Sequence, residues 1–305
     1  MEIQGVLCID KPKGFTSFDV VAKMRGIAKT RKVGHGGTLD PMATGVLPIF
    51  LGRATKACDL VPEQKKRYLA TFRLGLTTDT QDITGQVLQE RPVTCSLEQV
   101  QQVLAGFLGK QQQVPPMYSA VKVDGKRLYD LARQGKEVQR PSREIEIFSL
   151  DLVSYDLQQQ EYTVDVCCSK GTYIRTLCAD AGEELGCGAT LTQLRRTLSA
   201  GFALEQCITL EEAAQLAQEG TLQDHVQPIE QIFAVLPCVT LNPQQCKLFC
   251  NGARLDLDRI PQRPNTGEML RVQDEDGRFL GLAQEDLQEQ ALVMKKLFAL
   301  EENRS

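Results

Sequence analysis

One loop near the N-terminus combines several glycines with a single carboxylate. Glycine permits positive φ angles and close approach of the backbone, so this loop can present Asp40 to a ligand in a fixed orientation. Such a carboxylate could act as a nucleophile or as a general base. The same residues also fit an ordinary turn in which Asp40 bonds to the backbone before Pro41. The loop sequence is Gly34-His35-Gly36-Gly37-Thr38-Leu39-Asp40-Pro41-Met42-Ala43-Thr44-Gly45.

The sequence offers little material for a metal or redox centre. Its eleven cysteines are scattered, and no two of them have C-x-x-C spacing. This pattern is typical of reduced thiols in a cytosolic protein. The only two histidines are His35 and His225, and neither has a Cys or His neighbour at zinc-ligand spacing. We therefore predict that the protein binds no metal and needs no cofactor.

Turn residues and hydrophobic spacing predict the elements around this loop. A short strand leads to a Pro-Gly turn at residues 11–14, and a helix begins near Ser17. A polar QQQ break separates the last two predicted strands, which favours an antiparallel pair over a βαβ crossover. We therefore expect a mixed, largely antiparallel α/β (α+β) sheet flanked by helices. The strands are predicted over residues 67–76, 86–89, 144–156 and 161–168.

Helical spacing and capping residues predict four further helices. Ser96 caps the first of them, and Thr209 with Glu212 forms a capping box at the last. These helices accompany the strands, in agreement with a mixed α/β fold. Their expected ranges are residues 96–108, 172–186, 190–197 and 209–219.

The sequence pattern changes after Pro228, where a small β-rich part with its own turns begins. We therefore predict two domains, residues 1–230 and residues 235–300, with the boundary near 229–235. The elements expected in the second domain are a short helix ending at Asn251-Gly252, two strands around the Asp-Glu-Asp-Gly turn at 274–277, and a last strand over 291–299.

Charge is distributed unevenly along the chain. The formal net charge is -4, which by itself argues against a nucleic-acid partner because phosphates are neutralised by Lys and Arg. Residues 205–305 carry a balance of -8, whereas residues 1–204 carry a balance of +4. The basic surplus in the first two thirds permits an RNA partner without demonstrating one.

The N-terminal residues lack the basic and apolar regions of a signal peptide and the Arg- and Ser-rich character of a transit peptide. No uninterrupted apolar run reaches membrane-spanning length. We therefore expect a cytoplasmic protein with no membrane partner.

Six motifs follow one another over roughly two hundred residues. One of them is the loop around Asp40, within KVGHGGTLDPMATGVLP. The other five are IDKPKGFTS, RYLATFRLGLTTDTQDITG, PPMYSAVKVDGKRLYDLARQG, SKGTYIRTL and LRRT. Together they resemble the motifs of the TruB family of pseudouridine synthases, whose signature is G-H-x-G-x-L-D-P-x-A-x-G. Gly36 departs from the family pattern, because many members have Thr there, and we expect no loss of activity from this change.

The resemblance implies a pseudouridine-synthase sheet and a bacterial-type tRNA pseudouridine(55) synthase, an isomerase. Its partner would be tRNA, in which it converts one uridine of the T stem-loop to pseudouridine. In this family the aspartate at the position of Asp40 attacks either the ribose or the pyrimidine ring. The reaction needs a nucleophile or base and confinement of the detached uracil, but no redox centre or nucleotide.

The resemblance also implies base flipping, which costs roughly a few kcal/mol of stacking that the site must offset. Tyr68 is expected to lie against the flipped base and to take part in catalysis. Tyr173 and Leu194 would help to bind the base, and His35 would contact the substrate around the vacated space. From the residues alone, Tyr68 and Tyr173 also fit half-buried aromatic residues of a sheet and a helix start.

Arg175 matches the family arginine that pairs with the catalytic aspartate. Such a pair would favour the ionised carboxylate of Asp40 and orient it through a forked hydrogen bond. Taken without the family, Arg175 also fits an exposed cation at a helix start. By the same resemblance, Lys11 and Pro12 are expected to brace the catalytic loop and the RNA.

Residues 118–143 resemble the thumb insertion of the family. The segment is basic, contains glycine and includes Tyr118 and Tyr129. By resemblance it closes over the phosphate backbone of the T stem-loop, although a charge run alone is more often a solvated surface. The RNA-binding residues expected in it are Lys122, Lys126, Arg127 and Arg143.

The C-terminal part resembles the PUA-like domain of bacterial members, which is expected to touch the acceptor-stem side of the tRNA. Because this part is acidic, any RNA contact in it must come from a local basic patch. The family also suggests a monomer without an obligate protein partner.

Two other functions compete with a synthase. A non-catalytic tRNA-binding or tRNA-folding protein could flip the uridine without isomerising it, although Asp40, Tyr68 and Arg175 are all present. A folding-chaperone role is also compatible with catalysis. An acyl or glycosyl hydrolase would normally need a second carboxylate or a base-paired nucleophile, for which the sequence offers no evident candidate.

Overall fold

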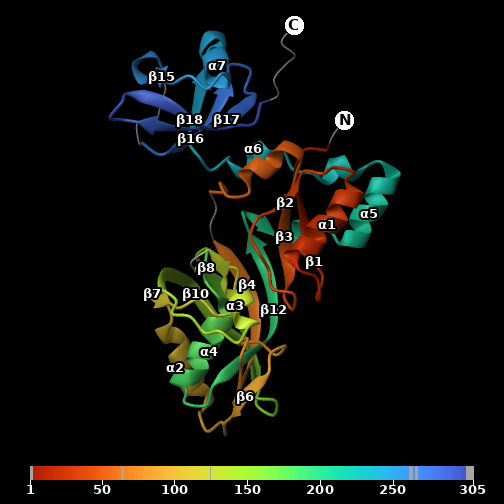
Figure 1. The fold of residues 1–305 in the computed structure, drawn as a ribbon, viewed down its shortest axis with the longest axis vertical. Helices are drawn as coiled ribbons and strands as arrows, with labels where there is room; N and C mark the ends of the chain where they lie inside the picture. The colour runs from red at the N-terminus through yellow and green to blue at the C-terminus, as the bar shows by residue number, and fades with distance from the viewer. Residues whose placement is uncertain (1–2, 63–64, 124, 261–263, 265–266, 300–305) are drawn as a thin grey trace.

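A computed structural model describes residues 3–62, 65–123, 125–260, 264 and 267–299 of the chain. The polypeptide forms one large sheet with helices against it and a smaller sheet near the C-terminus (Figure 1). The predicted mixed α/β fold is therefore confirmed. The two sheets occupy opposite ends of an elongated molecule, with the short helix α6 (Ile229–Ile232) between them.

Nine strands form the large sheet within the described residues, in the order β1-β3-β12-β4-β11-β10-β7, with β2 beside β3 and β13 beside β12. All neighbouring pairs are antiparallel except β3 and β12, which run parallel. The predicted antiparallel pair is present as β10 and β11. The bounds are β1 (Gly5–Lys11), β2 (Val33–His35), β3 (Thr44–Leu51), β4 (Lys66–Leu74), β7 (Gly109–Gln113), β10 (Arg143–Asp156), β11 (Glu161–Cys168), β12 (Ala189–Ser199) and β13 (Phe202–Ala203).

Helices begin where the capping residues predicted them. Ser96 caps α2 through a capping box with Gln99, and Thr209 caps α5 through the predicted box with Glu212. The helix expected near Ser17 starts at that residue. The bounds of the four long helices beside the large sheet are α1 (Ser17–Ile27), α2 (Leu97–Gly106), α4 (Ile174–Glu184) and α5 (Leu210–Glu219).

The helices divide the large sheet into two halves (Figure 1). Helices α2 and α4 pack on the half formed by β4, β10, β11 and β12, where alternate residues of β4 such as Ala70 and Phe72 are buried. Helices α1 and α5 pack on β1 and β3 around Val20, Met24 and Ala213. Each half therefore has its own apolar core. The predicted catalytic loop, residues 36–43 between β2 and β3, lies at their meeting point.

The helix predicted over residues 190–197 is wrong, because this segment is the central part of strand β12. Its leucines at 191, 194 and 198 have helical spacing in the sequence. In the structure β12 shifts register against β4 between Leu191 and Gln193 and again between Arg196 and Leu198. Such irregularities add residues to one strand and break the period-two alternation that marks a strand in a sequence.

The C-terminal sheet has the strand order β14-β16-β17-β18-β15. Strands appear on both sides of the predicted turn at 274–277, and α7 ends one residue before Asn251. The rings of Phe233, Phe279 and Phe298 lie 5.6–6.0 Å apart and join this sheet to the core beneath β1 and β3. The bounds are β14 (Cys238–Leu241), α7 (Pro243–Cys250), β15 (Leu255–Asp256), β16 (Met269–Asp274), β17 (Phe279–Asp286) and β18 (Ala291–Leu297).

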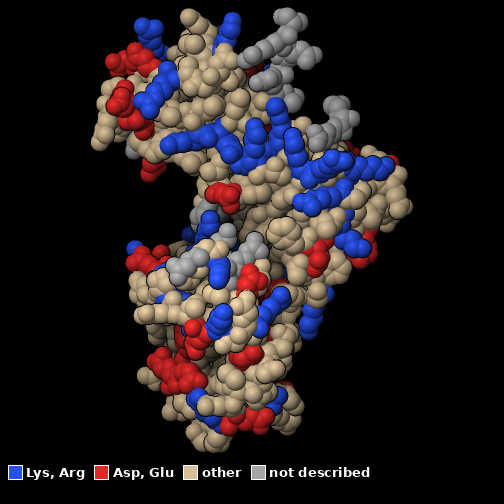
Figure 2. All heavy atoms as spheres, viewed as in Figure 1, with Lys and Arg blue, Asp and Glu red and all other residues tan. Residues whose placement is uncertain are grey.

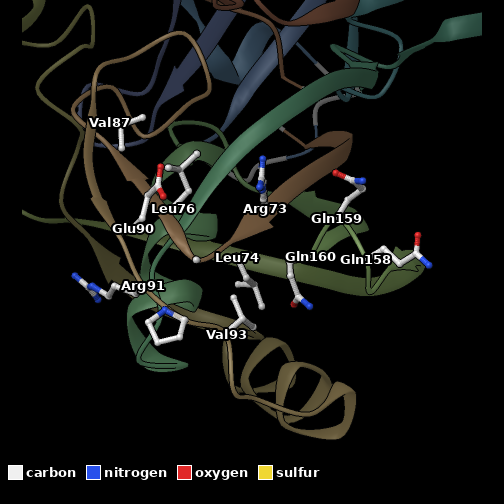
Figure 3. A pocket seen from close by; sticks show the side chains of 12 residues that line it. Arg73, Leu74, Leu76, Val87, Glu90, Arg91, Val93, Gln158, Gln159 and Gln160 are labelled. Carbon is white, nitrogen blue, oxygen red and sulfur yellow. The ribbon is translucent and has the colours of Figure 1, made fainter.

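Two small hairpins extend from the large sheet. The first pairs β5 (Leu76–Thr78) with β6 (Val87–Glu90), and the second pairs β8 (Lys122–Val123) with β9 (Lys126–Arg127) before α3 (Leu128–Ala132). A cavity of about 530 Å³ lies between the end of β4, the β6 side of the first hairpin and the turn that joins β10 to β11 (Figure 3). Its lining includes no residue predicted to act in the site.

A glycine fixes the contact between the catalytic loop and the sheet. Gly45, the second residue of β3, has a φ of +101° and is the register partner of Arg196 on β12. A Cβ at this position would overlap the backbone carbonyl oxygen of Arg196. The parallel contact between β3 and β12 therefore requires glycine at position 45.

We expect Gly45→Ala to lower the free energy of unfolding by about 3–5 kcal/mol, because the strained φ angle and the overlap act together. Gly14→Ala is the matched control, since Gly14 has a φ of +87° and no atom within 4 Å of the added Cβ. That variant should lose only about 1–2 kcal/mol. Urea unfolding measures both values, and equal losses would contradict the role assigned to Gly45.

Candidate active site

The catalytic loop is held by hydrogen bonds to its backbone. The Ser17 hydroxyl at the start of α1 accepts from the Leu39 amide at 2.9 Å, and Gly14 donates to the Pro41 carbonyl at 2.8 Å. The buried guanidinium of Arg196 donates to the carbonyls of residues 37, 38 and 46. Bonds to the backbone fix the loop on both sides of residue 40 without using its side chain.

Lys11 braces the same loop through backbone carbonyls. Its side chain is fully buried, and its ammonium donates to the carbonyls of Pro12 at 2.9 Å, Phe15 at 2.6 Å and Pro41 at 3.4 Å. Burial lowers the pKa of Lys11 to about 8. The expected bracing role fits these contacts, and the expected contact of Lys11 with RNA stays a prediction.

Asp40 and Arg175 form the forked ion pair expected from the resemblance. Arg175 Nε lies 2.9 Å from Asp40 Oδ2, and Arg175 Nη2 donates to Asp40 Oδ1 at 3.3 Å. The arginine side chain is 4% exposed, whereas the aspartate side chain is 35% exposed. Arg175 also donates to the carbonyls of Thr80 and Tyr118, both at 2.8 Å. The carboxylate is thus oriented by a buried cation and still open to a ligand.

A second carboxylate, not singled out from the sequence, lies behind this pair. Asp82 Oδ2 is 3.8 Å from Arg175 Nη1, and its other oxygen accepts from the Thr80 hydroxyl at 2.9 Å and the Thr84 amide at 3.0 Å. Asp82 is 5% exposed. Its segment, TTDTQDITG, resembles the family in sequence, but its polar character alone does not indicate a buried carboxylate. A buried position for Asp82 follows from the bridge it makes with Leu191 on β12, which sequence spacing does not reveal.

The surroundings raise the pKa of Asp40 above its ordinary value of 3.8. Burial is the largest cause, the nearby charge of Asp82 adds to it, and the charge of Arg175 opposes both. A raised pKa makes a carboxylate a stronger nucleophile or base while it remains ionised near neutral pH.

Asp40 shares one cavity with three residues that are predicted to bind the base. This cavity has a volume of about 360 Å³, and Tyr68, Tyr173 and Leu194 contribute to its wall. Tyr68 is 6% exposed, and burial raises the pKa of its phenol, which stays neutral. Gln113, which sequence reasoning missed, holds Tyr173 by accepting from its amide at 2.8 Å and donating to its carbonyl at 3.1 Å.

His35 lies in a neighbouring cavity of about 720 Å³ that shares Asp40 with the first. Its ring meets the exposed Phe18 ring edge-on, with centroids 5.9 Å apart. Within the described part of the chain, its Nδ1 atom has no hydrogen-bond partner. Burial and the charge of Arg196 lower the pKa of His35, so the imidazole is neutral at pH 7.

The thumb insertion reaches this site through residues 118–120. The Tyr118 carbonyl accepts from Arg175, and Ser119 lines both cavities with a buried hydroxyl that has no partner among the described residues. Gly36, where the family pattern has Thr, leaves room for the Phe50 ring.

The structure describes the side chains of two of the four thumb residues that are expected to contact RNA. Lys126 is exposed in β9. Arg143 reaches the turn at Gly171, where its Nη1 lies 3.8 Å from the place of an added Cβ. The side chains of Lys122 and Arg127 lie outside the described residues.

In the described part of the chain, no three His, Cys, Asp or Glu side chains come together as a group that could hold a metal ion. Over the same residues, no helix has both the length and the apolar character needed to cross a bilayer.

Three family models cover most of the chain. A model described as TruB family pseudouridylate synthase (N terminal domain) matches residues 25–174. The tRNA pseudouridylate synthase B C-terminal domain matches residues 175–234, and pseudouridine synthase II TruB, C-terminal, matches residues 237–290. The chain therefore belongs to the TruB family of pseudouridine synthases.

Relatives with the name tRNA pseudouridine synthase B match nearly the whole chain. The protein of Acaryochloris marina (strain MBIC 11017) is 46% identical over 283 residues, which cover 92% of this chain and 94% of that protein. The protein of Bacillus subtilis (strain 168) is 42% identical over 285 residues, which cover 92% of each.

A solved structure confirms the fold. A chain in the crystal structure of a Cbf5-Nop10-Gar1 complex matches with a TM-score of 0.76 and 28% identity, covering 98% of this chain and 86% of that chain. The shared arrangement includes both sheets, since nearly all of this chain is aligned.

We expect Arg175→Met to lower the free energy of unfolding by about 3 kcal/mol, because it leaves Asp82, Asp40 and two carbonyls without their buried cation. Arg67→Met is the matched control, since Arg67 pairs with Asp165 on an exposed surface, and its loss should stay under about 1 kcal/mol. Urea unfolding measures both. A loss no larger than that of the control would contradict the central place of Arg175.

Proposed function

We propose that this protein is a tRNA pseudouridine synthase that isomerises the uridine at position 55 of the T loop. The observation that carries the proposal is the forked Asp40–Arg175 pair, which opens into a cavity lined by Tyr68 and Leu194. Relatives of the same family and of nearly the same length are named for this enzyme. Their name supports a tRNA substrate for this chain.

The site supplies what the isomerisation needs. Asp40 is the nucleophile that attacks the flipped nucleotide, at its ribose or at its ring, and Arg175 keeps the carboxylate ionised and oriented. Tyr68 stacks on the uracil, while Tyr173 and Leu194 complete the wall that confines the detached ring. His35 is neutral and occupies the adjoining cavity, where it contacts the RNA around the vacated space.

RNA binding is supported by cations that gather away from the acidic surfaces. One cluster consists of four cations that lie close together, namely Lys32, Arg53, Lys56 and Lys296. Burial lowers the pKa of Lys56, and the charges of the other three lower it further. Figure 2 shows a band of Lys and Arg side chains where the C-terminal sheet meets the rest of the molecule. Such a cluster fits the phosphates of a tRNA, although the chain as a whole is acidic.

We also propose separate roles for the two parts of the chain. Residues 1–230 form the catalytic domain, with residues 118–143 as a thumb that closes over the T stem-loop through Lys126 and Arg143. Residues 235–300 form a PUA-like domain that meets the acceptor-stem side of the tRNA. The enzyme acts as a cytoplasmic monomer and needs no protein partner.

A first experiment compares the wild-type protein with Asp40→Asn on an unmodified tRNA transcript, without metal or nucleotide. Carbodiimide treatment and primer extension map pseudouridine. We expect a stop at the T-loop uridine with the wild type and none with the variant, because the amide cannot act as the nucleophile. Filter binding should show that Asp40→Asn still binds the transcript.

A T-loop stop that persists with Asp40→Asn would exclude Asp40 as the nucleophile. Binding without any stop by the wild type would contradict a synthase and favour a tRNA-folding protein instead. A folding role is tested separately, by asking whether Asp40→Asn accelerates the refolding of a heat-denatured transcript. This second function is favoured by the unpartnered polar groups of His35 and Ser119, which suit RNA binding irrespective of catalysis.

The pH dependence of the single-turnover rate provides another prediction. Asp40 must be ionised, so the rate should fall tenfold for each pH unit below its pKa. The apparent pKa of this acidic limb of the pH profile should be higher than 3.8. Asp82→Asn removes a negative charge that raises this pKa, so the limb should move to lower pH. Circular dichroism over the same range controls for unfolding. An unchanged or higher limb would contradict the electrostatic role of Asp82.

A further inference from the structure

The cavity that holds Asp40 also has a cationic side. Lys66 and Lys170 both line it. Lys66 is the first residue of β4, and side chains two residues apart on a strand share a face, so it follows Tyr68 into the cavity. Its ammonium lies 3.1 Å from the place that a Cβ on Gly37 would occupy. Lys66 therefore contacts the catalytic loop as well as the space for the base.

Lys66 has no anionic partner among the residues that the structure describes. Among the described residues, its ammonium makes neither a hydrogen bond nor an ion pair, in contrast to Lys11 and Arg175. Burial and then the charges of Arg196 and Lys170 lower the pKa of Lys66 to about 8. A lysine held among other cations is stabilised by any anion that enters the cavity. The titratable and charged groups that face it are Arg196 of β12, Cys168 of β11, Lys170 of the turn before α4, and Asp40 and Tyr68 in the same cavity wall.

A third cation approaches from β10. Arg143 Nη1 lies 3.8 Å from the place of a Cβ on Gly171, which also lines the cavity, and Arg143 has no ion pair among the described residues. Lys66 and Lys170 thus line the cavity from β4 and from the turn at 169–173, and Arg143 of β10 lies beside that turn. Uracil is neutral, and the only anionic groups of an RNA substrate are its phosphates.

We propose that Lys66, together with Lys170 and Arg143, binds an RNA phosphate next to the uridine that occupies the cavity. This proposal rests on the proposed function, because it takes the occupant of the cavity to be a flipped nucleotide. The phosphate neutralises the cationic side of the cavity and anchors the backbone while the base lies against Tyr68. Lys66 is accordingly a positioning residue for the reaction.

Binding is measured with an RNA hairpin of the T stem-loop sequence and with the protein in the Asp40→Asn background, so that turnover does not interfere. We expect Lys66→Met to weaken binding about tenfold and to reduce the slope of log Kd against log salt by about one. The matched control is Lys65→Met, which removes the same charge from a side chain that lies over the Phe148 ring. Its binding should match that of the parent protein.

A pH series separates a charge effect from a structural one. The affinity of the parent protein should fall between pH 7 and pH 9.5, because Lys66 loses its charge as the pH rises through about 8. Lys66→Arg keeps the charge and should bind with little change over this range. Lys11 also has a pKa of about 8, so the comparison with Lys66→Arg isolates the contribution of Lys66.

Hairpins with a neutral methylphosphonate on either side of the target uridine identify the group that Lys66 meets. One of these changes should weaken binding by the parent protein and have little further effect on Lys66→Met. The proposal would be overturned if the methylphosphonate weakened binding by Lys66→Met as much as it weakens binding by the parent protein. It would also be overturned if Lys66→Met bound the unmodified hairpin as tightly as the parent protein does. Pseudouridine formation by the wild-type protein is scored separately, so a failure of the proposed function remains distinguishable from a failure of the phosphate contact.

Discussion

The burial of one guanidinium group is the constraint on which the rest of the site depends. Arg175 can remain charged inside the protein only because two carboxylates and two backbone carbonyls surround it. These partners come from the catalytic loop, the segment after β5 and the thumb. Satisfying a single cation therefore ties three distant parts of the chain together, and the same contacts leave Asp40 pointing into the cavity.

Buried cations serve a second purpose around the catalytic loop. Lys11 and Arg196 direct their donors at backbone carbonyls on either side of Asp40 and hold the loop without occupying its carboxylate. Lys66 differs from them, because no described group of the protein accepts from its ammonium. The cations with protein acceptors hold the loop, whereas the cation without one is the residue for which we propose a phosphate contact. An acidic protein can in this way bind a polyanion through a few well-placed positive charges.

Local signals in the sequence predicted local structure well. The starts of α2 and α5 follow from capping residues, and the start of α1 follows from a turn and hydrophobic spacing. The β10–β11 pair follows from alternation and a short polar break, because neighbours in sequence decide these features. Strand β12 was mistaken for a helix, since its register shifts give it helical leucine spacing. The burial of Lys11 depends on the packing of β1 against the loop, which no local pattern reports.

The sequence by itself determined the family, because ordered motifs carry its residues together. Through that resemblance it also predicted that Asp40 pairs with Arg175, as the structure shows. Only the tertiary structure decided which other side chains join them. Asp82, Gln113 and Lys66 reach the site through strand pairings and turns that connect residues far apart in the chain. Their burial and their charge environment result from packing in three dimensions, whereas spacing along a sequence records only the contacts that neighbouring residues make.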